Sequence, residues 1–293
     1  MKPSAFDYVR PSSVDEAIAH LEQFGDRAKV IAGGQTLMAT LNMRLSAPEL
    51  LVDIGRIPGL SGIEVRGSLV SIGALTTHRE IERSALLARH VPLLTQAAPH
   101  IAHAAIRNSG TIGGSIAFAD PAAEWPACCL ALDAVIVIRG AGGERRVPAR
   151  NYFHNLYETD LSATEIITAI ECPITPPARR SVFLELARRQ GDYAIVGLAL
   201  LARIDADKLH EVALAFVGAG PTPMLATTAM TALEGRTPDA ETLHAAREAL
   251  TRDLDPGPDL YTSAATKRHL AGVLLGRAIA QLMSGGDQTH GTA

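Results

Sequence analysis

The pattern of apolar and polar residues predicts a small α/β unit at the start of the chain. A capping box at residues 13–16 is followed by apolar positions on one helical face, and Gly25 ends the pattern. Short apolar runs at 28–32 and 50–54 read as strands, and residues 36–43 between them have helical composition. The pattern therefore predicts a β-α-β-α-β unit.

The middle of the chain predicts a mainly antiparallel region with helices inserted. Apolar residues alternate from 60 to 73 around Arg66-Gly67-Ser68, which indicates a hairpin, and a second capping box lies at residues 77–80. The sequence further predicts a helix over 92–105, a glycine-rich turn over 109–115, and strands over 134–138 and 165–172.

A proline-rich segment, P-I-T-P-P from Pro173 to Pro177, marks the expected domain boundary because proline cannot extend a sheet ladder. Beyond it the sequence predicts strands over 181–187, 194–204 and 211–217, and then helices over 238–250 and 263–282. Strands followed by helices are typical of an α+β domain. We expect domains at 1–57, 58–175 and 178–285, and an unstructured tail at 286–293.

Composition and charge exclude several classes of protein. There are 27 Lys and Arg against 31 Asp and Glu, giving a net charge of −4 without a basic block, which argues against a nucleic-acid partner. The densest apolar run, residues 193–202, is too short to cross a bilayer and reads as a buried strand. Asp7 and Arg10 lie where an export signal would be apolar, so we expect a cytoplasmic protein without a membrane span.

Common catalytic and metal motifs are missing from the sequence. The three cysteines form no C-x-x-C pair, and the chain lacks the P-loop, Rossmann, zincin and nucleophile-elbow patterns. His100 and His103 have the i, i+3 spacing that could share a metal, but no third ligand is near, so ordinary helix histidines are the favoured interpretation. We expect no metal site on this chain.

Two glycine pairs flanked by hydroxyl residues remain as candidates: Ile31-Ala32-Gly33-Gly34-Gln35-Thr36 and Thr111-Ile112-Gly113-Gly114-Ser115. At the first, glycines after a strand permit φ > 0 and close backbone approach, so that successive N–H groups can form an anion nest before a helix. Either pair alone is more simply a tight turn. Together they favour two turns that clamp the pyrophosphate of a dinucleotide.

Four motifs give the chain a family resemblance. A-G-G-Q-T at residue 32, T-I-G-G-S at 111, D-P-A-A-E-W-P at 120 and R-R-Q-G-D-Y-A ending at 194 resemble the FAD-binding medium subunit of the molybdenum hydroxylases, the xanthine dehydrogenase and CO dehydrogenase family. The resemblance implies an α+β fold: a vanillyl-alcohol-oxidase (PCMH)-type FAD-binding domain of two α/β subdomains, and then a C-terminal α+β domain with a three-stranded sheet and helices.

The resemblance also implies the residues that hold FAD. It places the pyrophosphate on the two glycine segments, Asp120 and Glu124 on ribose or adenine, and Ile101 and Ala102 along the isoalloxazine. It also implies a flavin contact from Ile167 or Thr168, and Tyr193 stacking on the ring or shielding it. The full set is Ile31, Ala32, Gly33, Gly34, Gln35, Thr36, Leu37, Ile101, Ala102, Thr111, Ile112, Gly113, Gly114, Ser115, Asp120, Glu124, Ile167 and Tyr193.

Plainer interpretations stay open for several of these residues. Asp120 and Glu124 could belong to a surface D-P turn, Ile101 and Ala102 to a helix packing face, and Tyr193 could cover the strand that follows it. Gln35 departs from the His of many relatives, and Glu185 from the Lys of several, so no role can rest on a cation at either position.

The resemblance implies an oxidoreductase subunit that transfers electrons and needs no catalytic residue of its own. A large subunit would hydroxylate the substrate at a molybdopterin cofactor, and two [2Fe–2S] clusters on a small subunit would carry electrons to FAD here. FAD would pass these electrons to an external acceptor. The complex would be a heterotrimer of one large (L), one medium (M) and one small (S) subunit, doubled to an (LMS)2 heterohexamer. Two alternatives stay open: a stand-alone FAD-dependent oxidoreductase of the same fold, and a non-enzymatic scaffold with a decayed nucleotide site.

Overall fold

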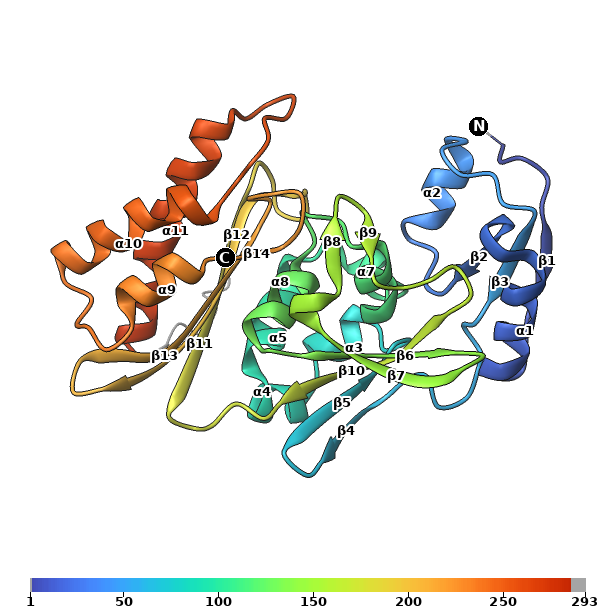
Figure 1. Ribbon diagram of the computed structural model, residues 1–293, viewed down its shortest axis with the longest axis horizontal. Helices are drawn as coiled ribbons and strands as arrows, with labels where there is room; N and C mark the ends of the chain where they lie inside the picture. Colours follow the sequence, from blue (N-terminus) through green and yellow to red (C-terminus); the bar gives the residue numbers. More distant parts are fainter. Residues whose placement is uncertain (1, 286–293) are drawn as a thin grey trace.

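Three structural units follow one another along the chain and lie in a row (Figure 1). The computed structural model describes residues 2–285, and the predicted tail, 286–293, lies outside the described residues. A three-stranded sheet comes first, a five-stranded sheet second, and a four-stranded sheet with three helices last. None of the helices within residues 2–285 is long and apolar enough to span a bilayer.

The first unit is a parallel sheet with strand order β1-β3-β2, as the β-α-β-α-β pattern predicts. Helix α1 begins where the Ser13 side chain accepts a hydrogen bond from the Glu16 N–H, and it ends at Gly25, where φ is +55°. The capping box is only half formed, because the Glu16 carboxylate binds the backbone and hydroxyl of Ser12 instead. The elements are β1 (Asp7–Val9), α1 (Val14–Phe24), β2 (Ala28–Ile31), α2 (Leu37–Asn42) and β3 (Leu50–Asp53).

The second unit is an antiparallel sheet with strand order β4-β5-β10-β6-β7. The predicted hairpin is confirmed, since Arg66 pairs with Leu69 across the turn. Strand β7 and the small ladder of β8 with β9 were not foreseen from the sequence. The strands are β4 (Ile63–Arg66), β5 (Leu69–Gly73), β6 (Val135–Gly140), β7 (Gly143–Pro148), β8 (Phe153–Asn155), β9 (Glu158–Thr159) and β10 (Ile166–Pro173).

A run of short helices connects β5 to β6 and carries most of the candidate site. The predicted capping box at Thr77 and Glu80 is complete, with both reciprocal hydrogen bonds present. The helices are α3 (His78–Glu82), α4 (Ala85–His90), α5 (Pro92–Ala97), α6 (Ala104–Arg107), α7 (Ile112–Phe118) and α8 (Glu124–Ala131).

The predicted helix over 92–105 is wrong, because the chain breaks it into two pieces. Helix α5 ends at Ala97, a 3-10 turn covers Ala98–His100, and α6 begins only at Ala104. Pro99 has no N–H to continue the helical ladder, and Ala102 has a left-handed φ of +42°. The break places the Ile101–Ala102 segment in a turn instead of on a helix face.

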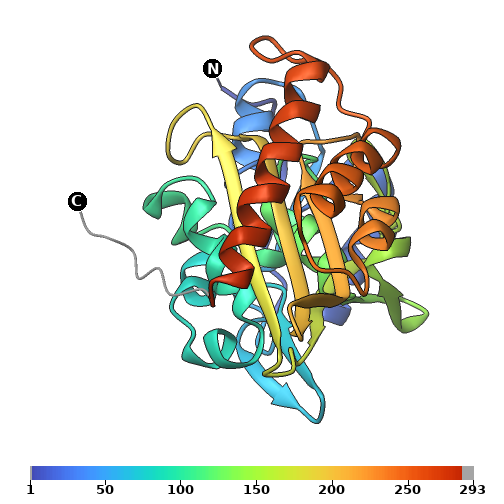
Figure 2. The same cartoon turned by 90° about the vertical axis from the view of Figure 1, so that its left-hand side faces the viewer.

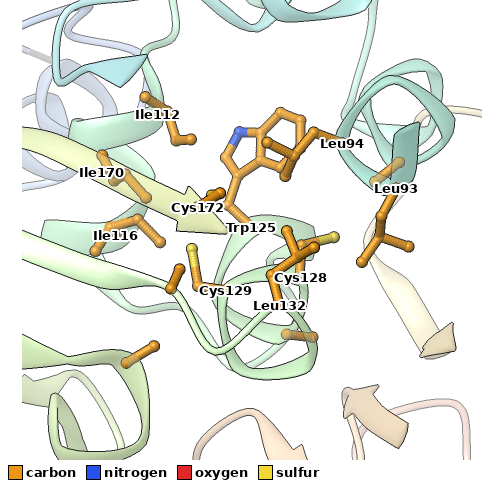
Figure 3. Close-up of a cluster of buried hydrophobic side chains, with 14 of the residues drawn as sticks. Leu93, Leu94, Ile112, Ile116, Trp125, Cys128, Cys129, Leu132, Ile170 and Cys172 are labelled. Atoms are coloured by element: carbon orange, nitrogen blue, oxygen red, sulfur yellow. The ribbon is translucent and has the colours of Figure 1, made fainter. Parts of the chain in front are cut away.

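Helix α8 is buried at the centre of the molecule (Figure 3). Trp125 and the three cysteines, Cys128, Cys129 and Cys172, are free of solvent, and burial raises the pKa of each thiol. The indole Nε1 of Trp125 donates a hydrogen bond of 2.9 Å to His78 Nδ1, and burial lowers the pKa of His78 to about 4. His78 is therefore a neutral acceptor that ties α3 to α8.

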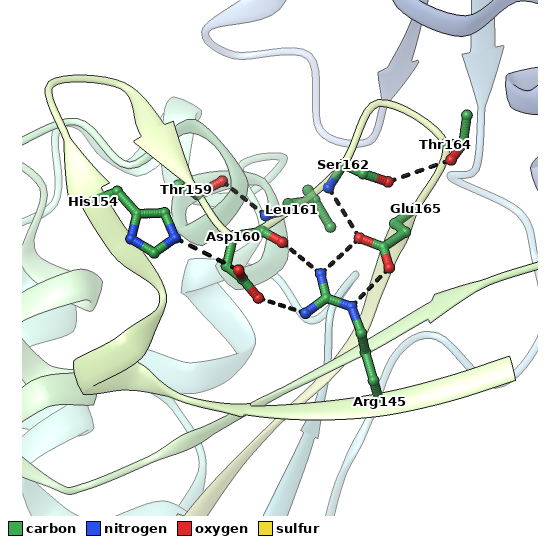
Figure 4. Close-up of polar contacts among 8 residues, drawn as sticks. All are labelled: Arg145, His154, Thr159, Asp160, Leu161, Ser162, Thr164 and Glu165. Atoms are coloured by element: carbon green, nitrogen blue, oxygen red, sulfur yellow. Dashed lines mark hydrogen bonds and ion pairs between the residues drawn. The ribbon is translucent and has the colours of Figure 1, made fainter. Parts of the chain in front are cut away.

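An ion-pair network fixes the loop that leads into β10 (Figure 4). Arg145 on β7 donates two hydrogen bonds of 2.7 Å to Glu165 and also pairs with Asp160. Glu165 in turn accepts the Ser162 N–H, and its pKa is lowered chiefly by its bonds to Arg145. The bidentate geometry holds residues 160–165 against the sheet.

The third unit is the predicted α+β arrangement, with its helices on one face of the sheet (Figures 1 and 2). The opposite face packs on α5 and α8. The three predicted strands and two predicted helices are present, and the short strand β14 and helix α9 are additional. The elements are β11 (Arg179–Ala187), β12 (Ala194–Asp205), β13 (Lys208–Val217), β14 (Met224–Leu225), α9 (Thr227–Leu233), α10 (Ala240–Asp253) and α11 (Ala264–Met283).

Strand β12 explains the dense apolar run in the sequence. Alternate side chains such as Ala199 and Leu201 join the core around α8, while Leu198 and Leu200 join the core under α9–α11. Because both faces of the strand are buried, its sequence lacks the polar alternation of a half-exposed strand. The core around α8 thus continues across the proline-rich segment into the third unit.

Candidate functional site

The first glycine segment is the turn between β2 and α2, and its two glycines have different roles. Gly34 has φ +68°, a backbone conformation that residues with a Cβ rarely adopt. Gly33 provides a close approach, because a Cβ at this position would lie 1.9 Å from the backbone oxygen of Ser109. The sequence prediction of positive φ and close backbone approach therefore describes this turn correctly.

The same turn carries a row of unpaired backbone donors. Across the described part of the chain, no acceptor is hydrogen-bonded to any of the five backbone N–H groups from Gly33 to Leu37. The first helical bond of α2 runs from Met38 N–H to Gly34 O. The Gln35 amide folds back and donates to Gly33 O at 2.8 Å, so it leaves the N–H row free. Successive free N–H groups before a helix form the kind of nest that binds phosphate oxygens.

The second glycine segment differs from its prediction. Residues 112–115 form the first turn of α7, capped by the Thr111 hydroxyl, so the predicted glycine-rich turn is wrong there. Gly113 is required for packing, since a Cβ would lie 2.5 Å from that of Ala74. The four backbone N–H groups of residues 112–115 already have acceptors. Ile112 donates to Thr76 O, Gly113 to Ala74 O, Gly114 to Thr111 Oγ1 and Ser115 to Thr111 O.

The two segments nevertheless meet in space. The contact of Gly33 with Ser109 and Gly110 brings the β2–α2 turn against the loop that enters α7. Gly110 in turn leaves no room for a Cβ, which would lie 2.7 Å from His78 Nε2. One segment therefore offers free N–H donors, and in the other Gly114 is exposed and Ser115 is partly exposed.

Ile101 and Ala102, the predicted isoalloxazine wall, lie in the turn between α5 and α6. Ile101 is nearly buried and Ala102 is half-buried. A Cβ on Gly191 would lie 2.9 Å from Ala102 O and 2.5 Å from the His103 ring, so the loop before β12 rests on this turn. The alternative that these residues belong to a helix packing face is wrong, because neither is helical.

Three carboxyl groups, those of Asp120, Glu124 and Glu185, lie near one another at the start of α8. Glu124 is buried, and burial raises its pKa to about 7. Burial, with the nearby charge of Glu124, raises the pKa of Glu185 to about 8, and Glu185 Oε2 has no hydrogen-bond partner within the described residues. Burial also raises the pKa of Asp120, whose Oδ1 accepts the Ala122 N–H at 2.8 Å. No role for a cation arises at position 185; the site holds protonatable acids instead.

Tyr193 stands clear of the strand that follows it. Its side chain is 74% exposed, so it does not cover the start of β12. Partial desolvation of the phenol, followed by the charges of Asp120 and Glu124, raises the pKa of Tyr193, so the phenol is within electrostatic reach of these carboxyl groups. Two aromatic residues that the sequence did not single out lie in the same region, Phe118 and Tyr157, with ring centroids 4.9 Å apart.

Ile167 is a candidate residue whose side chain belongs to the hydrophobic core. It is 4% exposed, belongs to the core around α8, and lies at a bulge in β10 where the register with β6 shifts. Its contact with a flavin stays a prediction. Among residues 2–285, no group of three or more His, Cys, Asp or Glu side chains has an arrangement that could hold a metal ion.

The fold and this site define a nucleotide-binding α+β protein. Residues 4–175 match the family model for the FAD binding domain in molybdopterin dehydrogenase, and residues 181–282 match the CO dehydrogenase flavoprotein C-terminal domain. The chain therefore belongs to the family of FAD-binding medium subunits of molybdenum hydroxylases, and it is an oxidoreductase subunit. Both the predicted family and the predicted fold class are confirmed.

Relatives resemble the chain over nearly its whole length. It is 38% identical to the 6-hydroxypseudooxynicotine dehydrogenase complex subunit alpha of Paenarthrobacter nicotinovorans, over 97% of this chain and 96% of that one. It is 36% identical to the carbon monoxide dehydrogenase medium chain of Hydrogenophaga pseudoflava, over 95% and 97%. A solved structure of the Hydrogenophaga enzyme, lacking the Mo-pyranopterin moiety of its cofactor, superimposes with a TM-score of 0.95 at 37% identity, covering 97% and 99%.

Proposed function

We propose that the pyrophosphate of FAD binds on the free N–H row of residues 33–37, with the start of α7 against its other side. The five unpaired N–H groups carry this proposal, because a folded protein rarely leaves a row of donors without acceptors unless a ligand or water supplies them. Thr36 is exposed and Ser115 is partly exposed, so their hydroxyls are available as further hydrogen-bond donors. The residues present therefore fit a bound diphosphate.

We place the remaining contacts along the line from α7 to β12. Asp120 and Glu124 would accept hydrogen bonds from ribose or adenine, and the Ile101–Ala102 turn would line the isoalloxazine. Tyr193, with its exposed ring beside the acidic cluster, would shield that ring from water. These residues bind and orient the cofactor; no proton transfer to a substrate is assigned to any of them.

Bound FAD would supply the ability to hold one or two electrons, which lets single-electron donors serve a two-electron acceptor. We propose that electrons arrive from two [2Fe–2S] clusters on a small partner subunit, after a substrate is oxidised at a molybdopterin cofactor on a large one. The external acceptor and the substrate are not fixed by this chain. The CO dehydrogenase and nicotine-pathway relatives act on very different molecules, which agrees with substrate choice on another subunit.

We propose a cytoplasmic (LMS)2 heterohexamer as the working assembly. Co-expression of the chain with its large and small partner genes, followed by native mass measurement, should give a complex containing all three chains. A catalytically competent homo-oligomer of this chain alone would instead support the stand-alone flavoenzyme. A chain that binds no FAD in either form would support the scaffold.

The nest is tested by Gly34→Ala, with Gly67→Ala as a matched control. Both glycines have positive φ, +68° and +62°, and neither has an obstructing neighbour, so alanine adds a similar strain of about 1–2 kcal/mol at each. Relief of that strain at residue 34 rotates the N–H row. We expect FAD affinity, measured by calorimetric titration, to fall at least tenfold for Gly34→Ala and to stay unchanged for Gly67→Ala. Equal affinities for the two variants would remove the pyrophosphate from this turn.

A further inference from the structure

The turn that precedes α6 has a backbone conformation that its own residues do not explain. Ala102 has φ +42°, a left-handed conformation that is strained for an L-residue, and an alanine side chain can form no local hydrogen bond to compensate. The residues on either side belong to a 3-10 turn and to the four-residue helix α6. Contacts from elsewhere must hold the turn.

Arg107, the last residue of α6, makes those contacts. Its Nη1 donates to the backbone oxygens of Ile101 and Ala102, each at 2.9 Å, and lies 3.4 Å from that of Pro99. The guanidinium thus lies back along its own helix and binds the carbonyl before Ala102 and the carbonyl of Ala102 itself. The side chain is only 12% exposed, so these bonds are formed largely out of water, where they are stronger.

Glu82 compensates the charge of the buried guanidinium. The Nε of Arg107 donates to Glu82 Oε2 at 3.1 Å, and the Glu82 side chain is 17% exposed. The same oxygen accepts a hydrogen bond of 3.1 Å from Arg79 Nη1. Arg79 touches none of the 99–103 carbonyls within the described residues, so the two arginines share a carboxylate but differ in what else they hold.

The turn also supports the loop that carries Tyr193. Gly191 has φ +80°, and the place of its missing Cβ is filled by His103 and by the Ala102 oxygen, at 2.5 Å and 2.9 Å. Only Asp192 separates Gly191 from Tyr193. A shift of the Ala102 turn would therefore move the base on which the tyrosine loop rests.

We propose that Arg107 is a positioning residue: by binding the Ile101 and Ala102 carbonyls it fixes the wall of the isoalloxazine site and, through Gly191, the placement of Tyr193. The proposal rests on the FAD site proposed above. It predicts that Arg107 controls the surroundings of the ring and leaves the pyrophosphate contacts at residues 33–37 intact.

The test compares Arg107→Gln, Arg107→Lys and the control Arg79→Gln in the full chain. Hydrogen–deuterium exchange of the chain without FAD is measured over residues 99–107 and 188–195. Loss of the two carbonyl bonds should speed exchange in both segments on the order of tenfold for Arg107→Gln, less for Arg107→Lys, and not for Arg79→Gln. Unchanged exchange in Arg107→Gln would overturn the proposal.

The same variants loaded with FAD report on the ring. For Arg107→Gln we expect FAD affinity within about threefold of wild type, a shifted visible spectrum, and fluorescence more readily quenched by iodide. A tenfold loss of affinity with an unshifted spectrum would contradict the assigned role. If the wild-type chain binds no FAD, the proposed function fails, whereas the exchange measurement still decides whether Arg107 holds the turn.

A second variant guards against a misfolded Arg107→Gln. Gly191→Ala places a methyl group against the His103 ring and the Ala102 oxygen without changing Arg107. It should speed exchange in residues 188–195 and shift the flavin spectrum while residues 104–107 keep wild-type exchange. Wild-type spectra and exchange in Gly191→Ala would show that the tyrosine loop does not depend on the Ala102 turn.

Discussion

At the scale of single residues, the candidate site combines positions that the sequence marks and positions that it hides. Gly33 and Gly34 stand out because a second glycine pair flanked by hydroxyl residues recurs at Gly113 and Gly114, whereas one pair alone would be read as a tight turn. Arg107 does not stand out, because its partners are backbone carbonyls whose direction depends on a strained turn. Unlike a capping box, a bond from a long side chain to the carbonyls of an irregular turn leaves no trace in the sequence pattern.

The buried Glu124 and the half-buried Glu185 predict a dependence of stability on pH. Their pKa values rise from an ordinary 4.5 to about 7 and about 8, so the folded chain binds more protons than the unfolded chain above pH 4.5. Their stabilising contribution is complete below that pH and is lost as pH rises through 7 and 8, by at most about 1.4 kcal/mol per pH unit for each group. Urea unfolding of the FAD-free chain from pH 5 to 9 should show this decline.

Glu185→Gln should remove the part of the decline between pH 7 and 8. Glu248→Gln, an exposed position on α10, serves as the control and should keep the wild-type profile. A wild-type chain whose free energy of unfolding stays level or increases across this range would show that the two carboxyl groups are ionised in the fold.

At the scale of elements, strands could be predicted from the sequence better than short helices. The longer strands contain apolar runs, and for β10 and β13 the run ends at Pro173 and Gly218, so that the two signals coincide. Between β5 and β6 the helices have four to eight residues, too few for a helical period to establish itself. There the ends are set by tertiary contacts: Arg107 on the Ala102 turn, and Ala74 against Gly113.

Helix α7 illustrates why Gly113 and Gly114 were mistaken for a turn. Both have poor helix propensity, but the Thr111 hydroxyl caps the Gly114 N–H at 3.1 Å and the helix packs tightly on Ala74. Thr111→Val keeps the shape and removes the cap, so we expect a loss of about 1 kcal/mol in unfolding free energy, together with several-fold weaker FAD binding.

Ser263→Ala is the matched control for the cap of α7. Ser263 caps α11 through the Thr266 N–H, also at 3.1 Å, in the third unit. Its loss should destabilise the chain by a similar amount, about 1 kcal/mol, with FAD affinity unchanged. If both variants bind FAD as wild type does, the start of α7 has no part in cofactor binding.

At the scale of the whole molecule, the sequence boundary at Pro173–Pro177 separates segments of chain but not hydrophobic cores. Ala199 and Leu201 of β12 pack with Trp125 in the core around α8, and their neighbours on the other face pack under α11. A composition shift can show where the chain leaves a sheet, but it cannot show that the next sheet lies on the same helix. The proposed isoalloxazine site draws on both units that share this core: the Ile101–Ala102 turn belongs to the second unit, and Gly191 and Tyr193 belong to the third.

A shared core predicts that the second and third units unfold together. Trp125 is the single tryptophan and is fully buried in α8, so its fluorescence reports on the centre of the molecule. Leu201→Ala opens a cavity beside α8, whereas Leu274→Ala opens one under α11, in a core that does not contain Trp125. Each substitution should lower the free energy of unfolding by about 2–5 kcal/mol.

If β12 couples the cores, both variants lower the midpoint of the Trp125 fluorescence transition, and far-UV circular dichroism gives the same midpoint. A Trp125 transition unmoved by Leu274→Ala, with a second transition in circular dichroism, would mean that the third unit unfolds independently and that the ring site spans two separately stable domains.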